Sequence, residues 1–204
     1  MHPLALRLSA YLGALFLSLG LILPFWPVYL EDKGLDAAQI GIVVAASSWA
    51  RVLGVPFWGR IADPPGRGRP TLIFLACASA LLYAGFFLAE GYLQALLLYL
   101  LVGFVFGAQA PLADSQILAA TKHHGGRAGG EKPPGEKPLD YGRVRLWGSV
   151  AFILGNLLGG WLIALENDDW FLLTIVLPLL AAAAAAWTLP RRPRDLAPRP
   201  RASY

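Results

Sequence analysis

The apolar residues of this chain form long blocks that are separated by short polar or charged segments. Each block is close to the ~20 residues that an α-helix needs to cross the hydrocarbon core of a bilayer. Prolines inside the blocks fit this interpretation, because membrane helices tolerate proline where neighbouring groups satisfy the freed carbonyls. The pattern predicts six transmembrane helices over residues 4–30, 40–62, 71–89, 92–120, 144–165 and 170–189.

The first block could be mistaken for a signal peptide. It is longer than the ~7–15 apolar residues of a signal peptide, and no A-x-A-like cleavage site follows it. We therefore expect it to remain as a helix. The expected fold class is an all-α integral membrane protein, with residues 1–190 forming one six-helix bundle.

Composition and charge agree with a membrane protein. The chain is 56% hydrophobic and only 15% charged, which is unlike an ordinary soluble domain. The net charge of +4 suggests nucleic-acid binding at first, but basic and acidic connections alternate along the chain. The positive-inside rule then predicts a multi-pass protein of the inner (cytoplasmic) membrane with both termini in the cytoplasm.

Two segments outside the apolar blocks are not expected to fold. Residues 121–139 are charged and rich in Gly and Pro, which predicts a cytoplasmic linker. His123 and His124 lie there without a neighbouring Cys or a third His, so we expect no metal site. Residues 191–204 form a basic, Pro-rich cytoplasmic tail.

Three ionisable residues lie at membrane depth: Arg51, Asp114 and Arg145. Such residues cost ~2.5–3.5 kcal/mol each at the bilayer centre on insertion scales, so we expect them to face the bundle interior. Asp114 and Arg145 both lie ~8–9 Å from the cytoplasmic helix ends at 1.5 Å per residue. Depth alone leaves two alternatives: they form a pair, or Arg145 reaches the headgroups beside Arg143. Arg143 and Arg145 lie ~200° apart on a helix and should face different sides.

A short motif follows the second predicted helix. The stretch GRIADPPGRGRP resembles the signature of the major facilitator superfamily between its second and third helices. Pro64 departs from that pattern, where the family usually has Arg or Lys, and this weakens the implied charge relay. The resemblance implies a cytoplasmic gate motif made of Gly59, Asp63, Gly66, Arg67 and Arg69.

Three further stretches narrow the resemblance. GLILPFWPVYLED, APLADSQ and LDYGRVRLWGSVAFILG resemble the branch that holds lactose permease and the phenylpropionate permeases. The match covers the amino-terminal six helices of a twelve-helix family. By position it implies that Asp114 and Arg145 bind substrate and proton, which favours their pairing. It also implies that Ser149 and Phe152 lie beside the substrate and that Arg51 is shared with the phenylpropionate branch. Phe25 and Trp26 are expected to add a stacking wall.

The resemblance implies proton-coupled uptake of a small organic substrate, such as an aromatic carboxylate like 3-phenylpropionate. A nucleoside or sugar symporter of the same superfamily remains an alternative, as does a truncated structural membrane protein without transport activity. An enzyme is not expected, because GxSG, HExxH and clustered carboxylates are missing from the predicted helices. Implied partners are the lipid bilayer and either a second six-helix half or a second copy of the chain. The proton is the coupling ion by resemblance, and no other cofactor is expected.

Overall fold

The computed structural model describes residues 3–125, 141–164 and 168–189. Six helical segments in this part of the chain are long and apolar enough to cross a membrane, which confirms the predicted all-α architecture with six spans. The elements are α1 (Pro3–Asp32), α2 (Ala37–Ala62), α3 (Gly68–Ala84), η1 (Gly85–Phe87), α4 (Tyr92–Phe106), α5 (Gln109–Gly125), α6 (Tyr141–Ile163) and α7 (Asp168–Trp187).

Several helices begin earlier than hydropathy predicts, because polar residues cap or enter their first turns. α2 begins at Ala37 because Asp36 forms a capping box with Gln39. The Gln39 backbone N–H donates to Asp36 Oδ1 at 2.8 Å, and the Asp36 backbone N–H donates to Gln39 Oε1 at 3.1 Å. α3 begins at Gly68 and includes Pro70, whose missing N–H has no helical partner to lose in a first turn.

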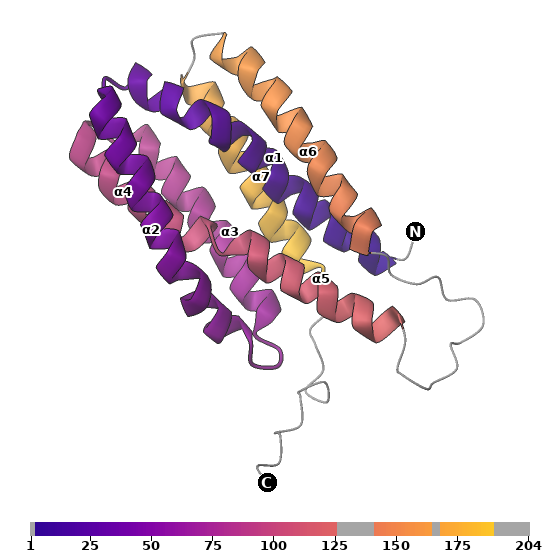
Figure 1. The fold of residues 1–204 in the computed structure, drawn as a ribbon. Helices are drawn as coiled ribbons and strands as arrows, with labels where there is room; N and C mark the ends of the chain where they lie inside the picture. The colour runs from indigo at the N-terminus through magenta and orange to yellow at the C-terminus, as the bar shows by residue number, and fades with distance from the viewer. Residues whose placement is uncertain (1–2, 126–140, 165–167, 190–204) are drawn as a thin grey trace.

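The helices form a bundle in which distant segments of the chain lie side by side (Figure 1). α1 packs against α6 and α7, α2 packs against α4, and α3 packs against α7 and α4. α4 and α5 together make the fourth span, and they are joined at a break over Gly107 and Ala108. α6 and α7 make the fifth and sixth spans.

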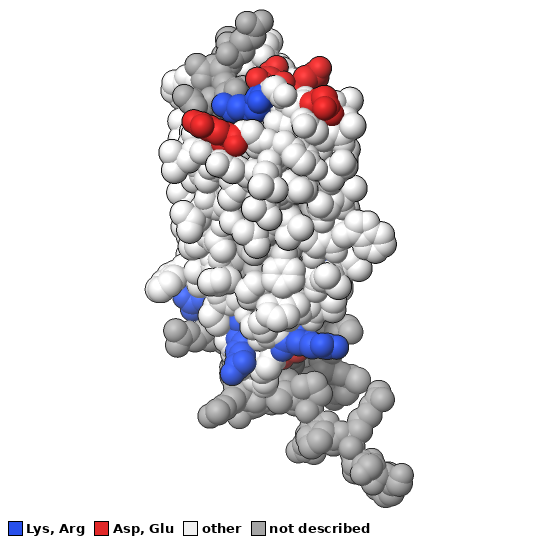
Figure 2. All heavy atoms as spheres, turned by 90° about the vertical axis from the view of Figure 1, so that its left-hand side faces the viewer, with Lys and Arg blue, Asp and Glu red and all other residues white. Residues whose placement is uncertain are grey.

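The charged side chains gather at the two ends of the bundle. Figure 2 shows most Lys and Arg side chains at one end and most Asp and Glu side chains at the other, with a broad uncharged band between. Arg7 near the start of α1 donates to the carbonyl of Thr188, just after α7, at 3.0 Å. The first and last described helices therefore begin and end on the same side. That this side is the cytoplasm remains a prediction from the positive-inside rule.

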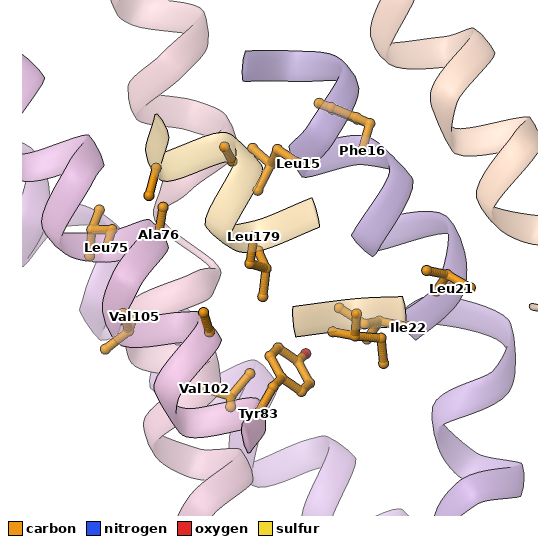
Figure 3. Packing of buried hydrophobic residues seen from close by; sticks show 14 of the residues in the cluster. Leu15, Phe16, Leu21, Ile22, Leu75, Ala76, Tyr83, Val102, Val105 and Leu179 are labelled. Carbon is orange, nitrogen blue, oxygen red and sulfur yellow. The ribbon is translucent and has the colours of Figure 1, made fainter. Parts of the chain in front are cut away.

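The core is built from aliphatic and aromatic side chains of all six spans, and Figure 3 shows part of it. Leu15 and Ile22 of α1 meet Leu75 of α3, Val102 of α4 and Leu179 of α7 in one buried cluster. At one end of this cluster an aromatic group surrounds the fully buried Trp26. Its members are Trp26, Tyr29, Tyr83, Phe86 and Tyr99.

The segment between the fourth and fifth spans differs from its prediction where it is described. α5 continues to Gly125, so residues 121–125 are helical and not part of a linker. Thr, Lys and His do not stop a helix, and the first glycine of the run is also where α5 ends. The rest of the predicted linker (126–139) and the predicted tail (191–204) lie outside the described residues.

Candidate functional site

A pocket of about 520 Å³ lies between α1, α2 and the fourth span. Volumes of roughly 300–1,000 Å³ are typical of small-molecule sites. Most of its lining is aliphatic, with Leu19 and Ile22 of α1 facing Val102 of α4. Its polar lining side chains are Ser47, Ser48, Arg51, Tyr83 and Tyr99. The pocket can therefore surround an apolar body and hold it by a few polar groups.

Arg51 carries the one formal charge among the residues that line this pocket. It lies near the middle of α2 and is exposed in the described chain. Its aliphatic stem crosses the fourth span at Gly107. A Cβ added at Gly107 would lie 2.4 Å from Arg51 Cγ and 2.7 Å from Cδ. Glycine at position 107 thus lets the arginine approach the fourth span closely.

The fourth span is interrupted where Arg51 reaches it. The sequence predicts one helix over residues 92–120, whereas the structure has a turn at Gly107 and Ala108 between α4 and α5. Pro111 has no N–H, so the Gly107 carbonyl four residues earlier loses its usual donor. The next N–H, that of Leu112, donates to the Ala108 carbonyl at 3.2 Å. Irregular backbone at membrane depth is tolerated where it lines a cavity.

A buried hydrogen-bond network fixes the start of α5 after this break. Gln109 is 0% exposed. Its Nε2 donates to Ser79 Oγ at 2.8 Å and to the Leu75 carbonyl at 3.4 Å, and its Oε1 accepts from the Tyr11 hydroxyl at 3.3 Å. The network joins α1, α3 and α5. Sequence reasoning missed it, although a lone glutamine in a long apolar run was the available signal.

Asp114 and Arg145 do not form the direct ion pair that was predicted. In the described part of the chain, Asp114 on α5 accepts a hydrogen bond from the Tyr141 hydroxyl at 3.4 Å. The Arg145 guanidinium lies over the Phe16 ring of α1, 4.2 Å from its centroid, as a cation–π contact. Tyr141 and Arg145 are one turn apart on α6, about 6 Å along the axis. The sequence therefore predicted the depth of Asp114 and Arg145 to within about one turn, but the side chains that they contact differ from the prediction.

The other predicted substrate contacts lie away from the pocket or in the core. Trp26 is 1% exposed, and its ring is stacked between Tyr29 (5.0 Å) and Tyr99 (4.9 Å), so no ring face is open to a ligand. Phe25 is half-buried, and its ring lies against Gly159 of α6. Phe152 is half-buried and Ser149 is exposed, and both are on α6 and outside the pocket lining. Among the described residues, no group of three or more His, Cys, Asp or Glu is placed to hold a metal ion.

A family model described as the MFS_1 like family matches residues 5–193, which is nearly the whole chain. The chain belongs to the MFS_1-like family of major facilitator transporters. The two reciprocal contacts between spans 1 and 5 and between spans 2 and 4 agree with the inverted repeats of three helices that make up one half of such a transporter.

Three curated relatives are similar to this MFS_1-like chain, and their names describe different functions. The chain is 36% identical over 176 residues to a probable 3-phenylpropionic acid transporter of Escherichia coli, covering 85% of the chain and 41% of the relative. It is 30% identical over 185 residues to a maltose permease of Geobacillus stearothermophilus, covering 88% and 42%. It is 27% identical over 170 residues to the quinolone resistance protein NorA of Staphylococcus aureus, covering 82% and 40%. The chain thus spans about two fifths of the length of these relatives.

The superfamily signature forms the turn between α2 and α3. Asp63 is the C-cap of α2 and is exposed. Gly66 has a φ of +81°, which favours glycine, and Arg67 is the N-cap of α3. The Arg69 guanidinium lies 5.6 Å from the Trp187 ring centroid, which connects this turn to the end of α7. Gly59 lies on α2, where an added Cβ would meet nothing within 4 Å. That these residues form a gate remains a prediction.

Proposed function

We propose that this chain is the amino-terminal half of a secondary active transporter that takes up a small organic substrate, an aromatic carboxylate such as 3-phenylpropionate. The observation that carries the proposal is the position of Arg51. It brings a guanidinium to an otherwise uncharged, largely aliphatic pocket at membrane depth. A guanidinium is the side chain best suited to binding a carboxylate, because it offers paired donors.

The pocket composition favours an apolar acid over a sugar. A ring or short chain can lie against Leu19, Ile22 and Val102, while its carboxylate binds Arg51. The relative named as a phenylpropionic acid transporter supports this substrate class. The relative named as a maltose permease keeps a sugar as the second candidate. A sugar needs many hydrogen bonds, and the pocket offers few polar side chains for them.

We propose that Asp114, at the contact between α5 and α6, couples transport to a proton. Asp114 lies half-buried there under the Tyr141 hydroxyl, and Arg145 is one turn further along α6. In the proposed cycle Asp114 gains a proton when substrate binds and loses it after release, with Arg145 as the nearby cation. Substrate and proton then move together, as in a symporter of the inner membrane.

Transport also requires a second wall for the pocket. Arg51 is exposed in the described chain, so the pocket is open beside this side chain, and we propose that a second six-helix half covers the opening. The two halves of such transporters are parallel repeats around an axis along the membrane normal. We propose that this wall comes from a carboxyl-terminal half or from a second copy of the chain, with both termini in the cytoplasm. A bundle without a second wall would be a structural membrane protein without transport.

Uptake of radiolabelled 3-phenylpropionate by cells that produce the protein tests the substrate assignment. We expect Arg51→Gln to lower the initial rate at subsaturating substrate on the order of 10- to 100-fold, because a charge-assisted hydrogen bond is lost. Arg60→Gln, an exposed arginine in the last turn of the same helix, is the matched control and should leave the rate within about twofold. Equal rates for wild type and Arg51→Gln would contradict the proposal.

An uncoupler tests the proposed role of Asp114. Wild type should accumulate substrate against its gradient and lose that accumulation when the proton gradient collapses. Asp114→Asn should bind substrate but fail to accumulate it, since the amide keeps an acceptor for Tyr141 but cannot carry a proton. Glu90→Gln, an exposed acid between η1 and α4, is the control and should accumulate substrate normally. Accumulation by Asp114→Asn at the wild-type level would overturn this role.

A further inference from the structure

The face of α2 that lines the pocket is polar only in its middle. The lining residues of α2 form one helical stripe, which consists of Val44, Ser47, Ser48, Arg51, Val52 and Val55. The polar members of this stripe lie between positions 47 and 51, a length of about 6 Å along the helix axis. Valines flank them on both sides. The polar part of a ligand that binds along α2 is therefore short, about one helical turn.

The polar groups of the lining that a ligand can reach lie on α2. Tyr83 and Tyr99 also line the pocket, but they are buried, at 0% and 9% exposed. The lining side chains of α1 are aliphatic. The side chain of a helical residue points back toward the N-terminus of its helix, so that of Arg51 points toward the turn that holds Ser47 and Ser48. A carboxylate held by Arg51 thus brings its neighbouring atoms close to these two serines.

The two serines differ in what their hydroxyls offer to a ligand. Ser48 is exposed, and its Oγ donates to the Val44 carbonyl of its own helix at 3.0 Å. Because its proton is engaged there, the Ser48 oxygen offers the pocket an acceptor. Ser47 is half-buried in the tight contact between α2 and α4, where a Cβ added at Gly103 would be 2.6 Å from Ser47 Oγ. One turn of α2 therefore presents a charged donor, Arg51, beside a neutral acceptor, Ser48.

The charge of the lining determines which kind of donor suits this acceptor. A hydroxyl or an ammonium group on the carbon next to the carboxylate could donate to Ser48 Oγ. An ammonium group would lie near the Arg51 guanidinium, and the described residues that line the pocket include no Asp or Glu to balance the second positive charge. Like charges placed together oppose binding. A hydroxyl makes the same hydrogen bond without this repulsion.

We propose that Ser48 is a specificity-determining residue, and that the pocket takes a 2-hydroxy carboxylic acid with an aromatic body. The carboxylate binds Arg51, the hydroxyl on the adjacent carbon donates to Ser48 Oγ, and the ring lies against the aliphatic lining. This inference rests on the proposed function. It narrows the substrate class, because it favours a 2-hydroxy acid over both the unsubstituted acid and the 2-amino acid.

Equilibrium binding of a matched set of acids to the chain in lipid nanodiscs tests the inference. The probes are 3-phenylpropionate and both enantiomers of its 2-hydroxy and 2-amino derivatives. At least one enantiomer of the 2-hydroxy acid should bind wild type about 3- to 10-fold more tightly than 3-phenylpropionate, the range for one net hydrogen bond. Both enantiomers of the 2-amino acid should bind about tenfold more weakly than 3-phenylpropionate or worse, because their ammonium group faces Arg51.

Serine and threonine variants separate recognition from folding. Ser48→Ala should reduce the preference for the 2-hydroxy acid to about 1 and leave the affinity for 3-phenylpropionate within about twofold. Alanine suits an exposed helix position, so this variant should fold. Thr174→Val on α7 is the matched control, because Thr174 Oγ1 also donates to the carbonyl four residues earlier, that of Trp170 at 2.6 Å, and Thr174 lies outside the pocket lining. The control should keep the preference.

Several results would overturn the inference while the proposed function still stands. In each of them 3-phenylpropionate binds wild type. Either the 2-hydroxy acid binds no more tightly, or its preference survives Ser48→Ala, or the preference is lost in Ser47→Ala and kept in Ser48→Ala, or the 2-amino acid binds as tightly as the 2-hydroxy acid. If none of the acids binds wild type, the proposed function is overturned and the inference with it.

Discussion

Two helix crossings in this bundle use the same packing device. Where α1 meets α6, a Cβ at Gly20 would lie 2.3 Å from the Phe152 carbonyl oxygen, and one at Gly155 would lie 2.4 Å from that of Leu17. Where α2 meets α4, a Cβ at Gly54 would lie 2.3 Å from the Phe104 carbonyl oxygen, and one at Gly103 would lie 2.1 Å from that of Ser47. Each crossing thus needs a glycine on both helices, and this lets the backbones touch.

The two crossings differ in whether the helix continues beyond its glycines. α6 runs without interruption from Tyr141 to Ile163. In the fourth span, α4 ends at Phe106, three residues after Gly103, and the pocket with Arg51 lies beside the break between α4 and α5. The same close approach of backbones therefore forms a continuous helix pair at the α1–α6 crossing and one wall of a cavity at the α2–α4 crossing.

In both regions an arginine side chain packs against a glycine, but a different part of the side chain makes the contact. At Gly107 an added Cβ would meet the stem of Arg51, at Cγ and Cδ. At Gly148 it would meet the tip of Arg145, 3.1 Å from Nη1, and the Phe16 ring, 3.3 Å from Cδ2. A tip can move aside more easily than a stem that is fixed near its Cα. The position of Arg51 is therefore the more constrained of the two.

Alanine at the crossing glycines should give the largest effect. We expect Gly103→Ala and Gly155→Ala each to lower the free energy of unfolding by about 3 kcal/mol, because the new methyl group clashes with backbone that cannot move independently. Thermal or denaturant unfolding in detergent micelles measures this. Gly41→Ala on α2 is the control, since nothing lies within 4 Å of its Cβ position, and it should be neutral or stabilise by up to about 1 kcal/mol. If Gly103→Ala and Gly155→Ala both behaved like Gly41→Ala, close backbone contact would not hold these crossings.

A smaller effect, on the affinity for 3-phenylpropionate, should distinguish the role of Arg51 from that of Arg145. Gly107→Ala should displace the Arg51 stem and weaken 3-phenylpropionate binding about tenfold, which corresponds to ~1.4 kcal/mol. Gly148→Ala should leave binding within about twofold, because the Arg145 tip can shift. Equilibrium binding in nanodiscs measures both variants. Equal losses for the two would mean that Arg145 contributes to the carboxylate site as much as Arg51.

The smallest expected effect concerns the two carbonyls that face Gly54 and Gly20. Phe104 O accepts a bond from Trp58 Nε1 across the α2–α4 crossing at 3.0 Å, whereas Phe152 O accepts one from Asn156 Nδ2 within α6 at 2.9 Å. Trp58→Phe should cost about 1 kcal/mol of unfolding free energy, and Asn156→Ala less than about 0.5 kcal/mol. The reverse order would show that the bond across the helices is not the stabilising one.

The sequence predicted the spans well because span length and charge alternation are set by the bilayer, and six segments of spanning length are present. It predicted facing and contacts less well. Helices in lipid are apolar on all sides, so hydropathy does not show that Trp26 faces the core. Depth placed Asp114 level with Arg145 but left the rotation of the helices open, and Tyr141 and Phe16 are their partners instead.

The break at Gly107 and the Gln109 network were also missed, though each had a local signal. Gly107 stands four residues before Pro111, which is the spacing at which a proline frees a carbonyl. Gln109 is the one long polar amide between Gln94 and Gln116, in an otherwise apolar run. Both signals indicate an irregular, hydrogen-bonded position, but neither tells which helices supply the partners.

The central claim is that Arg51 recognises the negative charge of the substrate, and a neutral analogue tests it most directly. The affinities of 3-phenylpropionate and its primary amide are compared for wild type and Arg51→Gln in nanodiscs. Wild type should prefer the acid on the order of tenfold or more, and Arg51→Gln should bind the acid and the amide about equally. A preference for the acid that persists in Arg51→Gln would place the carboxylate elsewhere and contradict the account.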